Sequence, residues 1–356
     1  MTDTPYYVEA LLSGSSWSSG PSTPVTLSFG FISESDFPAY YGAPEYDTYR
    51  ASFQPFNAAQ ESAARAALAT WSTVANVTFV ETAAASAQIT FGTVDLGDGV
   101  GGVGFYPGAA EGGDIWISNR YPEYAAPVVG DYTFSIFVHE VGHALGLKHP
   151  GDYDAISGGG TPPFLPPAED DAEHTVMSYH KDTTSDDEPR TPVLYDIAAI
   201  QHLYGANTQT NAGDTVYDIA ADGFPFMAIW DGGGTDTLDL SGLSSGVTLH
   251  LESGQFDDLP GAYNFTVAYG TDIENAIGSS GGGTIYGNAL DNILVAGGGK
   301  TTLAGGDGDD ALYATGADGG ISGPGSAGSD LLPPGEYPLT FPVLATAWTA
   351  AAATIR

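Results

Sequence analysis

The chain has 356 residues, of which 42% are hydrophobic and 12% aromatic, and it contains no cysteine. The length suffices for two domains with full cores, and the absence of cysteine excludes disulfides, thiolate nucleophiles and cysteine-based metal sites. The formal net charge of −36 opposes attraction to nucleic acid or to an anionic membrane, so we expect neither partner. Numerous aspartates and 49 glycines instead favour divalent cations, calcium above all.

Neither end of the sequence predicts a membrane or signal segment. Residues 1–5 lack the basic start and apolar run of a secretory signal peptide. The late apolar stretch, residues 339–355, is interrupted by Pro342 and by threonines and is too short to cross a bilayer. We therefore expect no membrane span.

Residues 1–205 combine strand-like runs with helical patterns. Asn57 and Gln60 form a capping-box pattern before an alanine-rich stretch, which predicts a helix over 58–71. The dipeptide Thr191-Pro192 predicts the start of a helix that ends at Gly205. The other expected elements are strands at 24–32, 77–81, 88–91 and 114–118, a glycine-rich loop at 97–104 and a helix at 133–145. We expect a mixed α and β domain over 1–205.

A nine-residue repeat follows, in a region rich in Gly, Asp, Asn and Thr. Each turn supplies one short strand with an inward apolar side chain and one glycine-rich corner that offers carbonyl oxygens to a cation. The repeat predicts a parallel β-roll over 206–322, and the loss of its period predicts a loosely ordered tail over 323–356. The inward residues occupy the eighth position of five consecutive turns, at Ile285, Leu294, Leu303, Leu312 and Ile321.

The clearest chemical signal is the segment 139–149, which contains His139, Glu140, His143, Gly146 and His149. Histidines at i and i+4 lie on one helix face, about 5–6 Å apart at Cβ, so both rings can reach one zinc ion. Gly146 lets the chain leave the helix so that His149 returns as a third ligand, and one metal position stays open for a water. Glu140 can then accept the proton of that water and pass it to a leaving amine.

A helix with incidental histidines is the alternative for this segment. A lone His-x-x-x-His pair is often of that kind. Here the glutamate, the glycine and the third histidine all stand at the offsets that a zinc peptidase requires, so we favour a catalytic zinc site.

A Met-turn, residues 176–179, follows the zinc motif, and the combination resembles the metzincin peptidases. The resemblance extends over roughly the first 320 residues. It implies an α+β metzincin zinc-protease domain followed by an all-β parallel β-roll of RTX repeats. The segments that resemble the serralysin branch of the metzincins are residues 113–116, 149–153, 176–179, 196–207 and 213–217.

The resemblance also implies roles for two residues of the Met-turn. The three histidines and the glutamate keep the roles given above, with one catalytic zinc. Met177 forms an apolar floor under the metal rather than a ligand. Tyr179 approaches the zinc as an extra ligand in the free enzyme and swings to hydrogen-bond the oxyanion during turnover. A core tyrosine is the alternative for this residue.

An exposed sheet edge is implied as well, on which an extended peptide adds as a further strand. Pairing through the main chain recognises a peptide more than its side chains, so it implies broad specificity. An interior strand is the alternative. The candidate is the strand at Gly102, Val103, Gly104, Phe105 and Tyr106, or its neighbour at 114–118.

Several structural calcium sites are implied in the second domain, with ordinary turn chemistry as the alternative. One roll turn matches the calcium nonapeptide at each fixed place, through Gly305, Asp307, Gly308 and Asp310. Neighbouring turns replace that last aspartate with glycine, asparagine or threonine, so we expect fewer roll calciums than the family's usual array. Two clusters resemble the family's sites at the head of the roll: one consists of Asn211, Gly213, Thr215, Asp231, Gly233, Gly234 and Asp236, the other of Asp272 and Glu274.

Two features depart from the family pattern. His180 follows the Met-turn tyrosine where the family usually has tryptophan, which affects the substrate wall rather than the metal site. Residues 353–356 lack the acidic-then-aliphatic end typical of type I export signals. The resemblance still implies a secreted, extracellular protein exported without an N-terminal signal peptide.

These observations favour a secreted, calcium-stabilised zinc metalloendopeptidase of broad specificity that hydrolyses peptide bonds by attack of a zinc-bound water. Its partners are then protein or peptide substrates and a proteinaceous protease inhibitor, and the chain is a monomer. Two alternatives stay open: a regulatory protease with a narrow target, and an extracellular calcium-binding module with a vestigial zinc site.

Overall fold

The computed structural model describes residues 4–154, 158–180, 188–222, 227–259, 263–313 and 320–321. The chain divides into two compact units, residues 1–207 and residues 208–356. The predicted tail at 323–356 lies outside the described residues. Within the described ranges, no helix combines the length and the apolar character needed to cross a bilayer.

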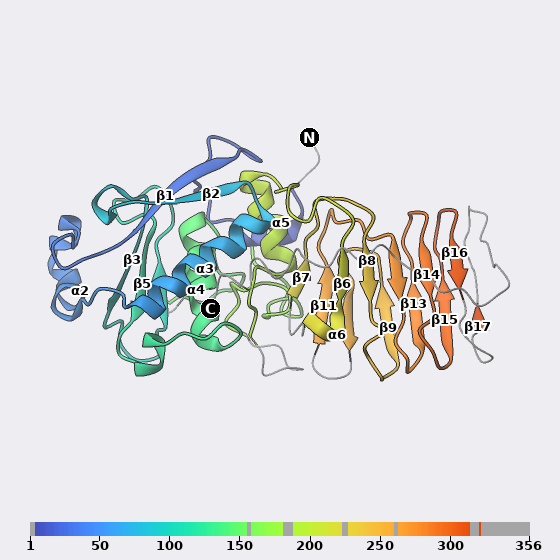
Figure 1. Ribbon diagram of the computed structural model, residues 1–356. Coiled ribbons are helices and arrows are strands. Elements are labelled where there is room, and N and C mark those ends of the chain that lie inside the picture. The colour runs from blue at the N-terminus through green and yellow to red at the C-terminus, as the bar shows by residue number, and fades with distance from the viewer. Residues whose placement is uncertain are drawn as a thin grey trace. The chain divides into compact units, whose positions relative to one another are not determined.

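The first unit contains a five-stranded sheet (Figure 1). Four strands are parallel and lie in the order β2 (Val77–Glu81), β1 (Val25–Phe31), β3 (Ile89–Val94) and β5 (Asp114–Ser118). β4 (Gly102–Gly104) pairs antiparallel with β5 and is the last strand of the sheet. The four parallel strands were predicted, and the structure makes β4 the edge and β5 an interior strand.

Two long helices of this unit pack against each other, α3 (Ala58–Val74) and α4 (Tyr132–Leu145). The predicted capping box of α3 is confirmed: Asn57 Oδ1 accepts the Gln60 N–H at 3.1 Å, and Gln60 Oε1 accepts the Asn57 N–H at 3.0 Å. The remaining helical elements before α4 are α1 (Tyr6–Leu11), α2 (Asp47–Ser52) and the 3₁₀ turns Ala39–Gly42, Pro44–Tyr46, Ala84–Ser86 and Pro122–Ala125.

Helix α5 (Leu194–Tyr204) begins later than Thr191-Pro192 predicts. Val193 is the N-cap, and its N–H donates to Asp196 Oδ2 at 3.0 Å. The buried Thr191 hydroxyl forms no hydrogen bond within the described residues. The predicted start is wrong. The pattern predicted that Thr191 caps the helix, but Asp196, inside the helix, accepts the N–H at the helix start instead.

An aromatic cluster holds β5 in place. Trp116 of β5 is fully buried, and its ring centroid lies 5.3 Å from that of Tyr41 and 5.7 Å from that of Phe37. Trp116 Nε1 donates to the Tyr41 hydroxyl at 2.8 Å, which donates to Asp114 Oδ2 at 2.9 Å. Because β4 pairs only with β5 among the described strands, this cluster also fixes the sheet edge.

The second unit is a parallel roll, as predicted (Figure 1). Four of the repeated apolar residues are buried and in register, with Ile285 opposite Leu303 and Leu294 opposite Leu312. Successive turns alternate between two sheets. One sheet contains β6 (Val216–Asp218), β8 (Thr237–Asp239), β12 (Asn275–Ile277), β14 (Ile293–Val295) and β16 (Ala311–Tyr313). The other contains β9 (Val247–His250), β13 (Gly283–Tyr286), β15 (Thr301–Ala304) and β17 (Gly320–Ile321).

Smaller elements complete the second unit. Helix α6 (Ile219–Asp222) follows β6. A three-stranded sheet has the order β10 (Phe256–Leu259), β11 (Tyr263–Val267) and β7 (Met227–Ile229).

Candidate active site

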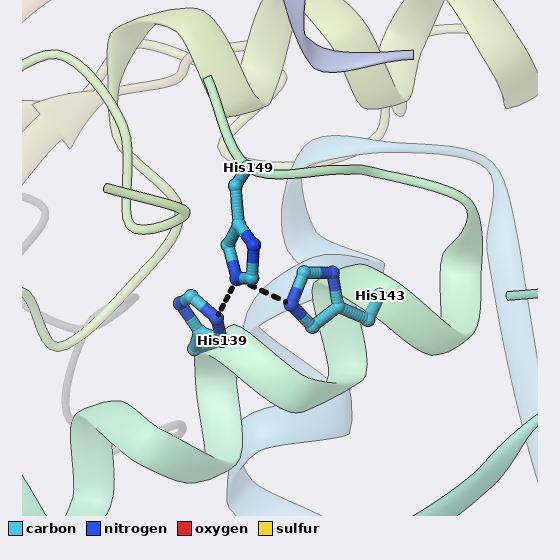
Figure 2. Close-up of side chains that lie close together, drawn as sticks. All are labelled: His139, His143 and His149. Carbon is cyan, nitrogen blue, oxygen red and sulfur yellow. Dashed lines mark hydrogen bonds between the residues drawn. The ribbon is translucent and has the colours of Figure 1, made fainter. Parts of the chain in front are cut away.

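Helix α4 carries His139, Glu140 and His143. It ends at Gly146, whose φ of +109° lies in the left-handed region that favours glycine. The chain reverses there, and His149 returns to the helix (Figure 2). The reversal predicted at Gly146 is therefore present.

The three imidazoles meet at their Nε2 atoms (Figure 2). His149 Nε2 lies 3.2 Å from His139 Nε2 and 3.0 Å from His143 Nε2. Two nitrogens bound to one tetrahedral zinc at 2.0–2.1 Å stand about 3.3 Å apart. The arrangement therefore fits one zinc ion shared by the three rings.

Main-chain carbonyls fix two of these rings. His139 Nδ1 lies 2.7 Å from Val176 O, and His143 Nδ1 lies 2.8 Å from Leu147 O. A carbonyl oxygen only accepts, so each Nδ1 carries the proton and each Nε2 presents a lone pair. A proton on His149 Nε2 could satisfy one of those lone pairs at most, whereas a cation satisfies all three nitrogens.

Burial keeps the three rings neutral. It lowers the pKa of His139 to about 4 and the pKa of His149 to about 3, and it pushes the pKa of His143 well below its ordinary value. Neutral imidazole is the form that binds zinc, so these rings are ready as ligands at neutral pH.

The Glu140 carboxylate lies beside the histidines and is nearly inaccessible to solvent. It accepts the Gly104 N–H, while its Oε2 has no hydrogen-bond partner in the described part of the chain. Burial raises the pKa of Glu140 to about 8. A Cβ at Gly102 would contact this carboxylate, so glycine allows β4 to approach α4 closely. A buried carboxylate of raised pKa can take up and release a proton near neutral pH.

Met177 lies beneath α4 and is fully buried. A Cβ at Gly142 would stand 2.6 Å from Met177 Sδ and 3.1 Å from the Trp71 ring, so the helix and the Met-turn touch at a glycine. The thioether thus occupies the floor under the helix that carries two of the histidines.

Asp196 of α5 anchors the Met-turn from the other side. Its Oδ1 accepts the Thr175 hydroxyl at 2.6 Å, and its Oδ2 accepts the Val176 N–H at 2.8 Å. Val176 O in turn faces His139 Nδ1, so the backbone of one residue, Val176, connects this fully buried aspartate with a histidine ring. Asp196 was not among the predicted site residues. The available signal was an acidic residue in the first turn of an otherwise apolar helix.

Tyr179 packs on the histidine rings. Its ring centroid lies 4.4 Å from that of His149 and 5.9 Å from that of His139. The residue is 47% exposed, so it belongs to the rim of the metal centre and not to the core.

A cavity of about 210 Å³ lies beside His139 and Glu140. Its walls come from three segments: the chain before β4, the outer face of α4, and the Met-turn with the residues around it. His180 forms part of the last wall, next to Tyr179. The other lining residues are Gly99, Val100, Gly101, Gly102, Tyr132, Ser135, Ile136, Ala172, Val176, Ser178, Glu188 and Pro189.

The sheet edge lies alongside α4. β4, which contains Val103, is half-buried, and among the described strands it pairs only with β5. The Phe105 N–H donates to Asp114 O at 3.0 Å, while its ring packs against the aromatic cluster. The Tyr106 ring lies 5.5 Å from the His143 ring. Of the five predicted substrate-binding residues, Phe105 thus packs inward, and the other four lie along the edge or at the metal centre.

The first predicted calcium cluster is held together by a short network. Asp231 Oδ2 accepts the Tyr217 hydroxyl at 2.5 Å, and Asp231 Oδ1 accepts the Gly233 N–H at 2.8 Å. Asn211 Nδ2 donates to the same Tyr217 hydroxyl at 3.1 Å. The structure therefore brings Asn211, Asp231 and Gly233 together.

Asp236 completes this cluster. Its Oδ1 accepts the Thr215 N–H at 2.8 Å, and Thr215 Oγ1 donates to Gly213 O at 2.8 Å. Gly234 lies against Gly213. Asp236 Oδ2 is buried without a hydrogen-bond partner in the described ranges, and burial raises the pKa of Asp236 to about 7, with Asp231 adding to the shift. A buried carboxylate oxygen in this position fits a hard cation.

The second predicted cluster joins the first. Glu274 Oε2 accepts the Asp236 N–H at 2.7 Å. Asp272 is exposed. Glu274 therefore lies at the first cluster, and within the described ranges no hydrogen bond connects its side chain with that of Asp272.

The matched calcium turn has a buried carboxylate at its corner. Asp310 is 1% exposed, its Oδ1 accepts the Asn292 N–H at 2.9 Å, and its side chain points at Gly305, where a Cβ would collide with it. Gly308 adopts a φ of +109°, which a side chain would strain. Asp307 is exposed.

Asn292 holds the equivalent corner two turns earlier. Its Oδ1 accepts the Asn288 N–H at 2.9 Å, and its Nδ2 donates to Glu274 O at 3.0 Å. The amide closes this corner through hydrogen bonds alone, because it supplies both a donor and an acceptor where a carboxylate supplies only acceptors.

These features define a class of protein. Three convergent histidines, a glutamate on the same helix and a methionine turn beneath them are the arrangement of a metzincin zinc peptidase, here accompanied by a parallel roll of short repeats.

Comparison with known proteins gives the family. The family model described as Matrixin matches residues 45–158, and the one described as Peptidase M10 serralysin C terminal matches residues 195–322. The chain belongs to the serralysin family of metzincins.

Three relatives illustrate the likeness. Metallopeptidase AprA of Pseudomonas marginalis is 37% identical over 270 residues, which cover 68% of this chain and 57% of the relative. Serralysin G of Dickeya chrysanthemi is 37% identical over 300 residues, 77% of this chain and 61% of the relative. Serralysin of Proteus mirabilis is 36% identical over 276 residues, 67% and 56% respectively. The matched part of the chain thus spans less than two thirds of each of these relatives.

We expect Asp196→Asn to weaken zinc binding by about 10- to 100-fold. The amide would place an N–H₂ group against an N–H or a hydroxyl donor, so the Met-turn would shift and Val176 O would hold His139 less well. Competition with a chromophoric chelator measures the affinity. Asp131→Asn is the matched control, because asparagine also caps a helix well and Asp131 caps α4. Equal zinc affinity in the Asp196 variant and the wild type would contradict the inferred link from Asp196 through Val176 to His139.

Proposed function

We propose that this chain is a secreted, calcium-stabilised zinc metalloendopeptidase of broad specificity. The observation that carries the proposal is the convergence of three Nε2 atoms at 3.0–3.2 Å with the buried Glu140 carboxylate and a cavity beside them. In this proposal residues 1–205 form the catalytic domain and residues 206–322 the calcium-binding roll.

The residues divide the work of peptide hydrolysis. His139, His143 and His149 would hold the zinc, which would supply Lewis acidity toward a water and a peptide carbonyl. Glu140 accepts the proton of the attacking water at its carboxylate and returns it to the amine that leaves. Tyr179, at the rim, donates a hydrogen bond from its hydroxyl to the carbonyl oxygen as negative charge develops there. Met177 keeps the floor of the centre apolar and dry.

Substrate binding follows from the edge strand and the cavity. An extended peptide adds to β4 by main-chain pairing along Gly102, Val103 and Gly104, with Tyr106 beyond them. The cavity of about 210 Å³ accepts one side chain next to the cleaved bond. Backbone pairing with a single side-chain pocket supports broad rather than narrow specificity.

Several structural calcium ions stabilise the roll in this proposal. The ligands come from the clusters at Asn211, Gly213, Thr215, Asp231, Gly233, Gly234 and Asp236, at Asp272 and Glu274, and at Gly305, Asp307, Gly308 and Asp310. Buried carboxylates at Asp236 and Asp310 support two of these clusters, since a divalent cation neutralises them.

The remaining assignments concern partners and location. We propose that the substrates are proteins or peptides, that a proteinaceous inhibitor can occupy the same edge, and that the protein is a secreted monomer. The vestigial-site alternative is disfavoured, because the three ligand atoms can reach one ion and Glu140 lines the adjoining cavity together with His139.

Glu140→Gln tests the catalytic proposal. We expect kcat/KM on casein-derived peptides to fall by at least about 100-fold, because glutamine cannot accept the proton, while the zinc content stays at one per chain. Glu123→Gln, at an exposed carboxylate in the 3₁₀ turn Pro122–Ala125, is the matched control and should keep full activity. Activity that survives in the Glu140 variant at equal zinc content would discredit the assigned base.

Calcium removal tests the role of the roll. We expect the region after Gly205 to unfold at lower temperature without calcium, before or together with the catalytic domain, because its buried carboxylates lose their counter-charge. Scanning calorimetry in calcium-containing and calcium-depleted buffer, with zinc content monitored, measures this. Asp236→Asn should reduce the calcium-dependent shift, whereas Asp98→Asn, at an exposed loop of the first unit, should keep it. Identical melts with and without calcium would count against the proposal.

A cleavage profile over a peptide library tests breadth. Recognition through the main chain predicts many cleaved sequences with a modest preference at one position. The inactive Glu140→Gln protein serves as the blank. Strict dependence on a single sequence would instead favour the narrow regulatory protease.

A further inference from the structure

Three aromatic rings stand in a row beside the metal centre, and the outermost has no assigned role. The Tyr153 ring stacks on the Tyr179 ring, with centroids 4.8 Å apart and planes 29° apart. The Tyr179 ring in turn lies 4.4 Å from the His149 ring. Tyr153 belongs to the same chain reversal as His149, four residues further on. Tyr179 is thus enclosed between a histidine ligand and a second tyrosine.

Tyr153 is held rigidly by a buried carboxylate. Its hydroxyl donates to Asp170 Oδ1 at 2.6 Å, and Ser178 Oγ donates to the same oxygen at 2.7 Å. Asp170 is 8% exposed. A Cβ at Gly151 would collide with the Tyr153 ring, so glycine there makes room for the ring. The hydrogen bonds fix the phenol at its polar end, and the close approach at Gly151 fixes it at its edge.

The same hydroxyl also contacts the backbone of the residue that it supports. The Tyr179 N–H donates to the Tyr153 hydroxyl oxygen at 3.3 Å. Tyr153 therefore holds Tyr179 twice, by a ring stack at the side chain and by a hydrogen bond at the main chain.

His180 completes the support, which accounts for the residue that departs from the family pattern. Its N–H donates to Ser178 Oγ at 3.0 Å, and its Nδ1 lies 2.9 Å from Asp170 O. The His180 ring meets the Tyr153 ring edge-on at 5.3 Å. The histidine thus adds to a network centred on Asp170.

We infer that Tyr153 is a positioning residue: its ring, immobilised by Asp170, sets the place from which the Tyr179 phenol reaches the reacting carbonyl. The inference rests on the proposed function, in which Tyr179 stabilises the oxyanion. Tyr179 is 47% exposed, and the Tyr153 ring limits the orientations of its side chain on one side while the His149 ring limits them on another.

Two substitutions at Tyr153 separate the ring from its hydroxyl. Tyr153→Leu removes the stack and the hydrogen bond, and we expect kcat to fall by about 2- to 10-fold with KM little changed, since the loss concerns the transition state. Tyr153→Phe keeps the ring and should retain most of kcat. Tyr286→Leu is the matched control: Tyr286 also stacks on a ring, that of His250 at 4.7 Å in the roll, and its loss should leave kcat unchanged.

A double-mutant cycle shows whether Tyr153 acts through Tyr179. In a Tyr179→Phe background, Tyr153→Leu should produce no further fall in kcat. An equal fall in both backgrounds would overturn the inference, because a purely structural defect does not depend on the Tyr179 hydroxyl. If Tyr179→Phe itself leaves kcat unchanged at full zinc content, the role of Tyr179 in the proposed function fails too. If Tyr179→Phe lowers kcat and Tyr153→Leu does not, only the positioning role fails.

A spectroscopic measurement avoids turnover altogether. With Cu²⁺ in place of zinc, a tyrosine phenolate near the metal gives a visible charge-transfer band. We expect Tyr179→Phe to abolish the band, Tyr153→Leu to weaken or shift it, and Tyr286→Leu to leave it unchanged. An unaltered band in Tyr153→Leu would show that Tyr179 keeps its place without the platform and would overturn the inference. Thermal melts of each variant confirm that the folded protein is measured.

Discussion

The crowding of three imidazole nitrogens is the constraint on which the first unit depends. His149 Nε2 stands 3.0 Å from one partner nitrogen and 3.2 Å from the other, and a single cation can satisfy all three lone pairs, whereas a proton on His149 can satisfy only one of them. Two of the nitrogens come from one helix face, but the third requires the chain to reverse at Gly146 with a backbone that only glycine adopts easily. The helix, its glycine end and the returning segment thus act together to place the three ligands.

Residues far apart in sequence complete the metal centre that helix α4 carries. The ring of His139 is oriented by the carbonyl of a residue 37 positions away, Val176, and the N–H of that same residue is held by Asp196 of another helix. Glycines at 102 and 142 let the sheet edge and the Met-turn come within contact of the same helix. The metal centre therefore forms only when these distant segments pack together, and its stability depends on the packing of α4, α5 and β4.

Short-range patterns were sufficient to predict much of this molecule. The i, i+4 histidines, the capping box at Asn57 and the nine-residue apolar period each depend on neighbours along the chain, and the structure contains all three features. The start of α5 was mispredicted because its cap is formed by Asp196, which is also occupied by the Met-turn 20 residues away. The roles of Asp196 and Asp170 were missed for the same reason: the partners of a buried carboxylate cannot be deduced from its neighbours in sequence.

The amide corner at Asn292 bears on how far the stability of the roll depends on ions in solution. The corner at Asn292 closes through hydrogen bonds of its own side-chain amide, while the corner at Asp310 contains a buried carboxylate whose negative charge a bound cation would balance. Under the proposed role of calcium, a single exchange of a side-chain oxygen for nitrogen would therefore convert a cation-dependent turn into an independent one. The ratio of the two kinds of corner would then set how low a calcium concentration the folded roll withstands.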